Sequence, residues 1–191
     1  MNETVKLALI LFLITAISAT VLAVSNDITA PKIAEADALK DENAKREILP
    51  DGEEFKPLDE GKLKAIQSSH SNISEIYEAY SSGHIVGYTI KMTTNGYGGE
   101  IEFMIGVSTE GRIMGINILN HGETPGLGAN ITKAYFTNSF KNKSTDGEIT
   151  ASKEPSGDTE VQALTSATRS TDAILDGVNT ALKVYNEELA N

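Results

Sequence analysis

A run of hydroxyl side chains precedes the last helical stretch of the chain. Between Leu164 and Thr171 the sequence reads LTSATRST, with Ser or Thr at five positions and Arg169 among them. The first turn of a helix offers free backbone N–H groups and the positive end of the helix dipole, and an arginine adds a counter-charge for an anion. The run therefore predicts a phosphate-binding site. The alternative is that the hydroxyls only cap the helix, with Ser170 or Thr171 as the capping residue.

A glycine-rich turn forms a second candidate ligand loop, with the sequence HGETPGLG at His121–Gly128. Within it, Thr124–Leu127 fits a type II turn, because Pro125 fixes φ at the second position and Gly126 supplies a positive φ at the third. Further glycines at both ends of the loop would let a ligand approach the backbone closely. The alternative is a tight turn that joins two elements and binds nothing.

The composition excludes several classes of function. The chain has 191 residues, with 27 Asp and Glu against 16 Lys and Arg and a formal charge of −11. Nucleic acid is not expected as a partner, because Lys and Arg clusters supply most of that affinity. The absence of Cys and the three scattered His residues predict neither a thiolate site nor a dedicated metal site. No serine elbow or triad is visible, so no catalytic residue is predicted. Any redox chemistry must come from an organic cofactor.

The N-terminal region contains an uncharged apolar stretch, LALILFLITAISATVLAV at Leu7–Val24. With Val5 and a snorkelling Lys6, it approaches the roughly 20 residues that a membrane-spanning helix needs. A cleaved signal peptide is the alternative, but its apolar region is usually shorter. The sequence therefore predicts a single-pass anchor in the cell membrane, surrounded by lipid. The basic flank lies on the N-terminal side, so the C-terminal domain is expected to be extracytoplasmic.

Helical segments are expected at three places after the anchor. Residues 34–48 are rich in helix formers, and Pro50–Gly52 ends that helix. Residues 63–80 are weakly periodic and are also predicted to be helical. The last helix is expected at 172–189. Its apolar side chains fall on one stripe, which consists of Ile174, Leu175, Val178, Leu182, Tyr185 and Leu189.

Strand patterns occupy the middle of the chain. Residues 84–92 are rich in strand formers. The alternating run at 101–107 and the second run at 113–119 after Glu110-Gly111 predict a hairpin. The polar segment 141–158 is expected to hold a short strand near 148–151 beside a mobile loop. The fold class is therefore α+β, with one domain built on an antiparallel sheet and flanking helices. The expected division is an anchor at 1–26, a helical stalk or linker at 27–62 and the domain at 63–191.

Four motifs carry a resemblance to a known family: the N-terminal anchor, Gly96–Gly99 (GYGG), His121–Gly128, and Thr165–Thr168 (TSAT) before the final helix. In this order and spacing they resemble the covalently flavinylated FMN-binding subunits. That family includes RnfG of the Rnf complexes and NqrC of the sodium-pumping NADH:quinone oxidoreductases. The resemblance covers essentially the whole chain and implies that residues 63–191 form an FMN-binding domain.

The resemblance implies that FMN is attached covalently, through its phosphate, to a threonine of a Ser/Thr-Gly-Ala-Thr motif. Thr168 matches that threonine. Ser166 stands where Gly is usual and Gln162 where Asp is common. Serine fits at this position if the backbone does not require a positive φ. Tyr97 and His121 are not included in the predicted site. The predicted cofactor-binding residues are Thr168, Thr165, Ser166, Ala167, Glu123, Thr124, Gly126 and Leu127.

The implied function is electron transfer by a flavoprotein subunit of a membrane-bound Rnf-type complex. Such a complex couples electron flow between ferredoxin and NAD to Na+ or H+ translocation, and this subunit alone is not a complete catalyst. The implied partners are other integral membrane and redox subunits, together with a flavin transferase for maturation. Two alternatives remain: an NqrC-like protein with quinone as acceptor, and a membrane-anchored binding domain without a redox role.

Overall fold

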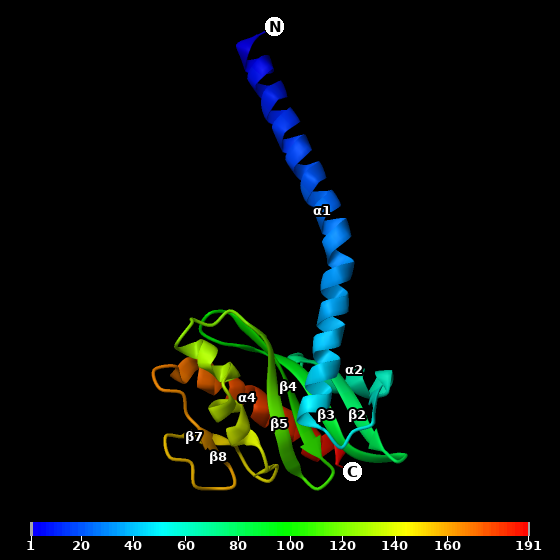
Figure 1. Ribbon diagram of the computed structural model, residues 1–191, viewed down its shortest axis with the longest axis vertical. Coiled ribbons are helices and arrows are strands. Elements are labelled where there is room, and N and C mark those ends of the chain that lie inside the picture. The colour runs from blue at the N-terminus through cyan, green and yellow to red at the C-terminus, as the bar shows by residue number, and fades with distance from the viewer. Residues whose placement is uncertain (1, 191) are drawn as a thin grey trace. The chain divides into compact units, whose positions relative to one another are not determined.

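The computed structural model describes residues 2–190 and has the expected α+β architecture (Figure 1). The helices and strands, in chain order, are α1 (Glu3–Ile48), β1 (Glu54–Pro57), α2 (Glu60–Ser69), β2 (Ile73–Ser81), β3 (His84–Asn95), β4 (Glu100–Ser108), β5 (Arg112–His121), η1 (Gly128–Thr132), α3 (Ala134–Thr137), η2 (Asn138–Phe140), β6 (Lys143–Ser144), β7 (Thr150–Ser152), β8 (Glu160–Gln162), α4 (Thr168–Val184) and η3 (Tyr185–Leu189).

The chain divides into two compact units, the first ending at Asp41 and the second beginning at Glu42. In the first unit, α1 contains the predicted apolar stretch, and the side chains of that stretch are exposed. Among the described residues 2–190, α1 is the one helix long and apolar enough to cross a membrane. Thus the first unit contains a stretch with the length and composition of a single membrane span.

The second unit is built on an antiparallel sheet of six strands that follow one another in chain order, β1 to β6. The predicted hairpin is confirmed as β4 and β5, in which Ile105 pairs with Ile116. On its other side β4 pairs with β3, where Ile90 lies opposite Ile105. β1 pairs with β2, so Glu54–Pro57, within the segment expected to be a stalk, forms part of the sheet.

One face of the sheet is covered by α4, which lies along β3 and β4 (Figure 1). The predicted apolar stripe of this helix is confirmed, since its six residues are all buried. The α-helix begins at Thr168 and ends at Val184, and Tyr185–Leu189 continue as a π-helical turn, so the predicted helical segment to residue 189 is confirmed and starts four residues earlier than expected. Gly177 faces the ring of Phe103 so closely that a Cβ there would lie 2.7 Å from Cζ.

The last turns of α1 belong to the second unit. Ala44 and Ile48 pack with Met104 and Leu119 in a small apolar cluster. Lys45 is 7% exposed; its Nζ lies 3.0 Å from a carboxylate oxygen of Glu42 and 3.9 Å from the centre of the Tyr77 ring. An ion pair and a cation–π contact together compensate the burial of the ammonium group.

The helix predicted at 63–80 is wrong in its second half. α2 ends at Ser69, and Ile73–Ser81 form β2. The buried residues Ile73, Ile76 and Ala79 recur every third position, which imitates helical periodicity. The register of β2 against β3 is irregular between Ile73 and Glu75 and again between Ala79 and Tyr80. A β-bulge of this kind moves a side chain to the other face and breaks the two-residue period of a regular strand.

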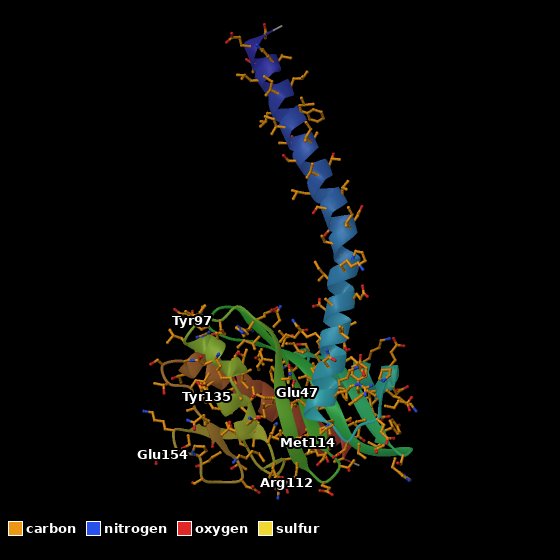
Figure 2. All side chains as sticks on the ribbon, viewed as in Figure 1. Glu47, Tyr97, Arg112, Met114, Tyr135 and Glu154 are labelled. Carbon is orange, nitrogen blue, oxygen red and sulfur yellow. The ribbon has the colours of Figure 1, made fainter. Side chains whose placement is uncertain are left out.

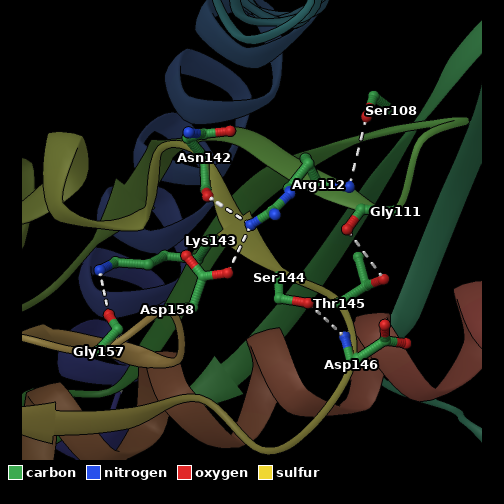
Figure 3. Close-up of polar contacts among 10 residues, drawn as sticks. All are labelled: Ser108, Gly111, Arg112, Asn142, Lys143, Ser144, Thr145, Asp146, Gly157 and Asp158. Carbon is green, nitrogen blue, oxygen red and sulfur yellow. Dashed lines mark hydrogen bonds and ion pairs between the residues drawn. The ribbon is translucent and has the colours of Figure 1, made fainter.

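Arg112 fixes the polar segment that follows η2 (Figure 3). Its Nη1 donates to Asp158 Oδ2 at 2.7 Å and to the Asn142 carbonyl at 3.3 Å. Lys143 Nζ donates to the Gly157 carbonyl at 2.7 Å. The short strand expected near 148–151 is found at Thr150–Ser152, paired in parallel with β8. These contacts join the segment to the end of the sheet.

Candidate functional site

A pocket of about 280 Å³ lies where three segments meet: the β3–β4 loop, the loop after β5 and the start of α4. Figure 2 labels Tyr97, which belongs to the first of these segments and is 73% exposed. The pocket is lined by Tyr97, Glu123, Thr124, Leu127, Gly128, Ser166, Ala167, Thr168, Arg169 and Ser170.

The structure brings most of the predicted site residues to this pocket. Six of them line it: Glu123, Thr124, Leu127, Ser166, Ala167 and Thr168. Gly126 and Thr165 do not line it, although each is adjacent in the chain to a residue that does. The two loops predicted from the sequence therefore face one another across a single cavity.

The turn at Thr124–Leu127 has the predicted geometry. The Leu127 N–H donates to the Thr124 carbonyl at 3.2 Å, and Gly126 has a φ of +77°. These are the closing hydrogen bond and the positive third-position φ of a type II turn. Leu127 is 44% exposed while lining the pocket, so the turn presents an apolar side chain to the cavity.

The prediction that Ser170 or Thr171 caps α4 is wrong. The helix begins at Thr168 with Ala167 at the cap position, and no side chain makes a cap hydrogen bond there. Ser170 and Thr171 lie in the first turn and are buried. The Thr171 hydroxyl donates to the Ala167 carbonyl at 3.1 Å and accepts from the Leu164 N–H at 3.3 Å. With no side-chain cap, the first-turn N–H groups and the dipole remain suited to an anion beside Thr168 and Arg169.

Ser166 adopts the backbone conformation that is unfavourable for serine. Its φ is +60°, so the condition of a negative φ for serine is not met. The left-handed region costs a residue with a Cβ roughly 1–2 kcal/mol, whereas glycine adopts it freely. The side chain is exposed and lines the pocket. The backbone conformation at this position therefore favours glycine, but there is room for the serine side chain.

Ser166→Gly is expected to increase the free energy of unfolding by about 0.5–1 kcal/mol, because relief of the left-handed strain exceeds the entropic cost of glycine. Chemical denaturation of the two proteins measures the difference. Thr165→Gly is the matched control. Thr165 is absent from the positive-φ residues of the described chain, so this change should lower stability. An unchanged or lowered stability of Ser166→Gly would contradict the assignment of strain.

Glu123 occupies the centre of the site and is only 5% exposed. Its Oε1 accepts from the N–H groups of Tyr97 at 2.8 Å and Gly98 at 2.9 Å. Its Oε2 accepts from the Ser170 hydroxyl at 2.5 Å. The Glu123 N–H in turn donates to Nδ1 of His121 at 3.2 Å. Both carboxylate oxygens are therefore bound by protein donors, which leaves Glu123 less free for a ligand than its place in the predicted site implies.

These contacts set the ionisation of Glu123. Burial acts to raise the pKa of its carboxyl, but hydrogen bonds from Ser170 and from the Gly98 and Tyr97 N–H groups outweigh burial. Together with nearby His121, they hold the pKa below its ordinary value of 4.5. A lowered pKa in the folded state stabilises the fold above the unfolded value, and this stability is lost as the pH falls through the folded value.

Glu123→Gln is therefore expected to lose less stability than the wild type when the pH falls from neutral to below about 4.5. Equilibrium unfolding in denaturant at a series of pH values measures the difference between the two proteins. Glu110→Gln, at an exposed position in the β4–β5 turn, should follow the wild-type curve. If the free energies of unfolding of the wild type and Glu123→Gln fall in parallel with pH, Glu123 ionises equally in the folded and unfolded states and the prediction is wrong.

Four pocket residues are not among the predicted cofactor-binding residues: Tyr97, Gly128, Arg169 and Ser170. An aromatic residue at the end of a strand is often buried, whereas Tyr97 is exposed. Its position between glycines in the sequence GYGG was the available signal. Ser170 was predicted only as a cap, because a sequence does not show which distant acceptor a hydroxyl will find.

Chemically, the lining of the pocket combines two kinds of group. The first turn of α4, with Arg169 and the Thr168 hydroxyl, suits an anionic group. Tyr97 and Leu127 suit a flat apolar group. A Cβ at Gly128 would meet Oε2 of Glu123 and the Ser170 hydroxyl, so the backbone of Gly128 packs directly against these two side chains. The residues present fit a ligand that contains both a phosphate and an aromatic ring system.

Comparison with known proteins also indicates that the part of the chain that contains the pocket binds a flavin nucleotide. A family described as FMN-binding domain matches residues 96–183, the span that contains all three pocket segments. The chain is 36% identical over 188 residues to the G subunit of the Na+-translocating ferredoxin:NAD+ oxidoreductase complex of Acetobacterium woodii, covering 94% of this chain and 90% of that protein. It is 30% identical to the G subunit of the proton-translocating ferredoxin:NAD+ oxidoreductase complex of Clostridium ljungdahlii, covering 87% and 83%.

Solved structures show a related fold. The C subunit of the Na+-translocating NADH-quinone reductase of Parabacteroides distasonis superposes with a TM-score of 0.56 at 22% identity, covering 71% of this chain and 77% of that one. NqrC of Shewanella oneidensis superposes with a TM-score of 0.51 at 18% identity, covering 73% and 81%. At these identities the likeness concerns the fold.

Proposed function

Because the chain belongs to the RnfG family, the G subunits of the ion-translocating ferredoxin:NAD+ oxidoreductase (Rnf) complexes, we propose that it transfers electrons within such a complex through FMN held in the pocket between Tyr97 and Thr168. The observation that carries this proposal is the coincidence of two findings. The FMN-binding match covers residues 96–183, and the pocket is built from both ends of that span.

The cofactor is joined to the chain covalently at Thr168. The bond formed is an ester between Oγ1 of Thr168 and the phosphorus of FMN. The substrate is an activated flavin nucleotide whose phosphoanhydride bond breaks in the same reaction, and the hydroxyl proton leaves with the departing nucleoside monophosphate. A flavin transferase carries out this step. Thr168 supports the role because it is exposed, lines the pocket and begins α4.

The chain's own residues then hold and orient the group. The first turn of α4 and Arg169 balance the phosphate charge, while Ser166 and Thr124 offer hydroxyls along the pocket. Leu127 and Tyr97 pack against the ring system. The isoalloxazine supplies the electron-accepting and electron-donating chemistry when bound. Attachment through the phosphate leaves the ring unmodified, and the tether raises the effective concentration of the cofactor at the pocket.

The anchor places this chemistry at a membrane. The apolar part of α1 spans the lipid bilayer once, with the domain on the extracytoplasmic side, as the distribution of charge around the stretch indicates. A single helix cannot form an ion path, so ion translocation belongs to other integral membrane subunits. These subunits and further redox subunits are the partners of the chain.

The test is the intact mass of the full chain, expressed with a flavin transferase and purified in detergent. The proposal expects a gain equal to FMN less one water, and fluorescence of the denatured band in a gel. The isolated protein should also titrate reversibly as a flavoprotein. A bare polypeptide mass in membranes with a functioning complex would refute the proposal and favour the binding domain without a redox role.

A second candidate is the NqrC-like role, with quinone as the final acceptor. The two solved structures share the fold with this chain, whereas the relatives with the greater identity belong to ferredoxin:NAD+ oxidoreductase complexes. The assembled complex separates the two. Reduced ferredoxin and NAD+ should support turnover in the first case, and NADH with a quinone in the second.

A further inference from the structure

The buried carboxylate of Glu123 connects all three segments of the pocket. Through Oε1 it holds the backbone of Tyr97 and Gly98, and through Oε2 it holds Ser170 in the first turn of α4. Glu123 itself belongs to the loop after β5. We propose that Glu123 is a positioning residue that holds Tyr97 at a fixed distance from Thr168, so that the flavin ring lies in one orientation in the pocket.

The backbone around this carboxylate leaves no room for side chains. A Cβ at Gly96 would meet Oε1 of Glu123, and one at Gly128 would meet Oε2 and the Ser170 hydroxyl. A Cβ at Gly98 would meet the backbone of Gly122. Gly96, Gly98 and Gly128 therefore allow the loops to pack tightly around Glu123.

The hydrogen bonds of Glu123 reach both Tyr97 and the helical turn that carries Thr168. Ser170 is two residues after Thr168 in the same helical turn, so fixing Ser170 fixes the start of α4. Tyr97 donates to Glu123 through its own N–H, so the carboxylate fixes the backbone of a residue that lines the cavity. Removing the carboxylate would leave three donors without their acceptor, including one on a buried serine. The β3–β4 loop would then be free to move relative to α4.

This inference rests on the proposed function, since it concerns the orientation of the flavin. The test compares Glu123→Ala and Glu123→Gln in the full chain, expressed with a flavin transferase. Visible-region circular dichroism and flavin fluorescence report the ring's surroundings, and intact mass reports attachment. Glu160 offers matched controls, because its carboxylate accepts from the Ser156 N–H at 2.9 Å and from the Ser156 hydroxyl at 3.3 Å, and it does not line the pocket.

Glu123→Ala is expected to keep the flavin attached but to lose most of its visible circular dichroism, with a several-fold rise in fluorescence as the ring leaves Tyr97. Glu123→Gln is expected to restore both signals, because its amide oxygen can accept from the two N–H groups and its NH2 can donate to Ser170. Ser170→Ala removes one of the three bonds and should give an intermediate effect. Glu160→Ala and Glu160→Gln should match the wild type.

Hydrogen exchange of residues 96–99 in the flavin-free chain supplies an independent measurement. Glu123→Ala should speed exchange of the Tyr97 and Gly98 amides by about tenfold or more, while Glu160→Ala should not. If the wild type carries no flavin, the proposed function is refuted. The hydrogen-exchange measurement then still tests the hydrogen bonds that Glu123 accepts. The inference is overturned if Glu123→Ala leaves the flavin signals unchanged, or if folded Glu123→Gln behaves like Glu123→Ala.

Discussion

Thr168→Ala is expected to abolish the FMN adduct completely, with the intact mass falling to that of the bare polypeptide and the gel band losing its fluorescence. Alanine removes the only atom of this side chain that can form an ester with phosphorus. It is also the best helix former, and Thr168 is exposed at the start of α4. The fold should therefore persist, and the thermal unfolding midpoint of the flavin-free chain should change little.

Two substitutions provide controls for this prediction. Thr132→Ala removes an exposed hydroxyl that lies outside the pocket and outside the Thr165–Thr168 motif, so attachment should continue. Thr168→Ser keeps a hydroxyl at the same place and should retain part or all of the adduct. An adduct that persists in Thr168→Ala would place the ester on another hydroxyl, and peptide mapping would distinguish Ser166 from Thr165.

Phe103→Ala is expected to lower the free energy of unfolding by about 3–5 kcal/mol. Phe103 lies on β4, has no exposed surface and packs against α4 at Gly177. Removing the ring leaves a cavity in the middle of the interface between sheet and helix, and the surroundings relax only in part. Denaturant unfolding of the flavin-free chain measures the loss.

Tyr135→Ala is the control for a large aromatic residue outside the core, because Tyr135 is 55% exposed (Figure 2). It should change stability by less than about 1 kcal/mol. Gly177→Ala adds a further check. It should destabilise the wild type, since a Cβ would press on the Phe103 ring, and should cost less in the Phe103→Ala background. Additive effects would contradict the direct contact.

The parts of the fold that followed from the sequence are those fixed by local pattern. Alternation at Ile101–Val107 and a second run after the turn predicted β4 and β5, and a stripe of apolar residues predicted α4. β2 was not predicted, because its buried residues Ile73, Ile76 and Ala79 recur at intervals of three where the strand has register irregularities. The irregularity depends on the partner strand β3, and the sequence of β2 alone does not contain it.

The candidate site was predictable in its pieces rather than in its assembly. Each loop could be recognised by its turn or hydroxyl chemistry, and the type II turn was correct in detail. The hydrogen bond between Ser170 and Glu123 joins residues 47 positions apart, and Ser170 lies inside the first turn of α4 rather than at its cap. Tyr97 was missed for a similar reason, since its exposure follows from the tightly packed glycine loop around the Glu123 carboxylate.

The consecutive order of the six strands has a consequence for biogenesis. As the chain emerges, each strand finds its neighbour already made, and the pairings from β2 to β5 require only short loop closures. Helix α4 is synthesised after all of them, and its arrival both covers the apolar face and delivers Thr168 to the cavity. If FMN is attached at Thr168 as proposed, the hydroxyl that accepts it reaches its place in the pocket only once α4 has docked on the sheet.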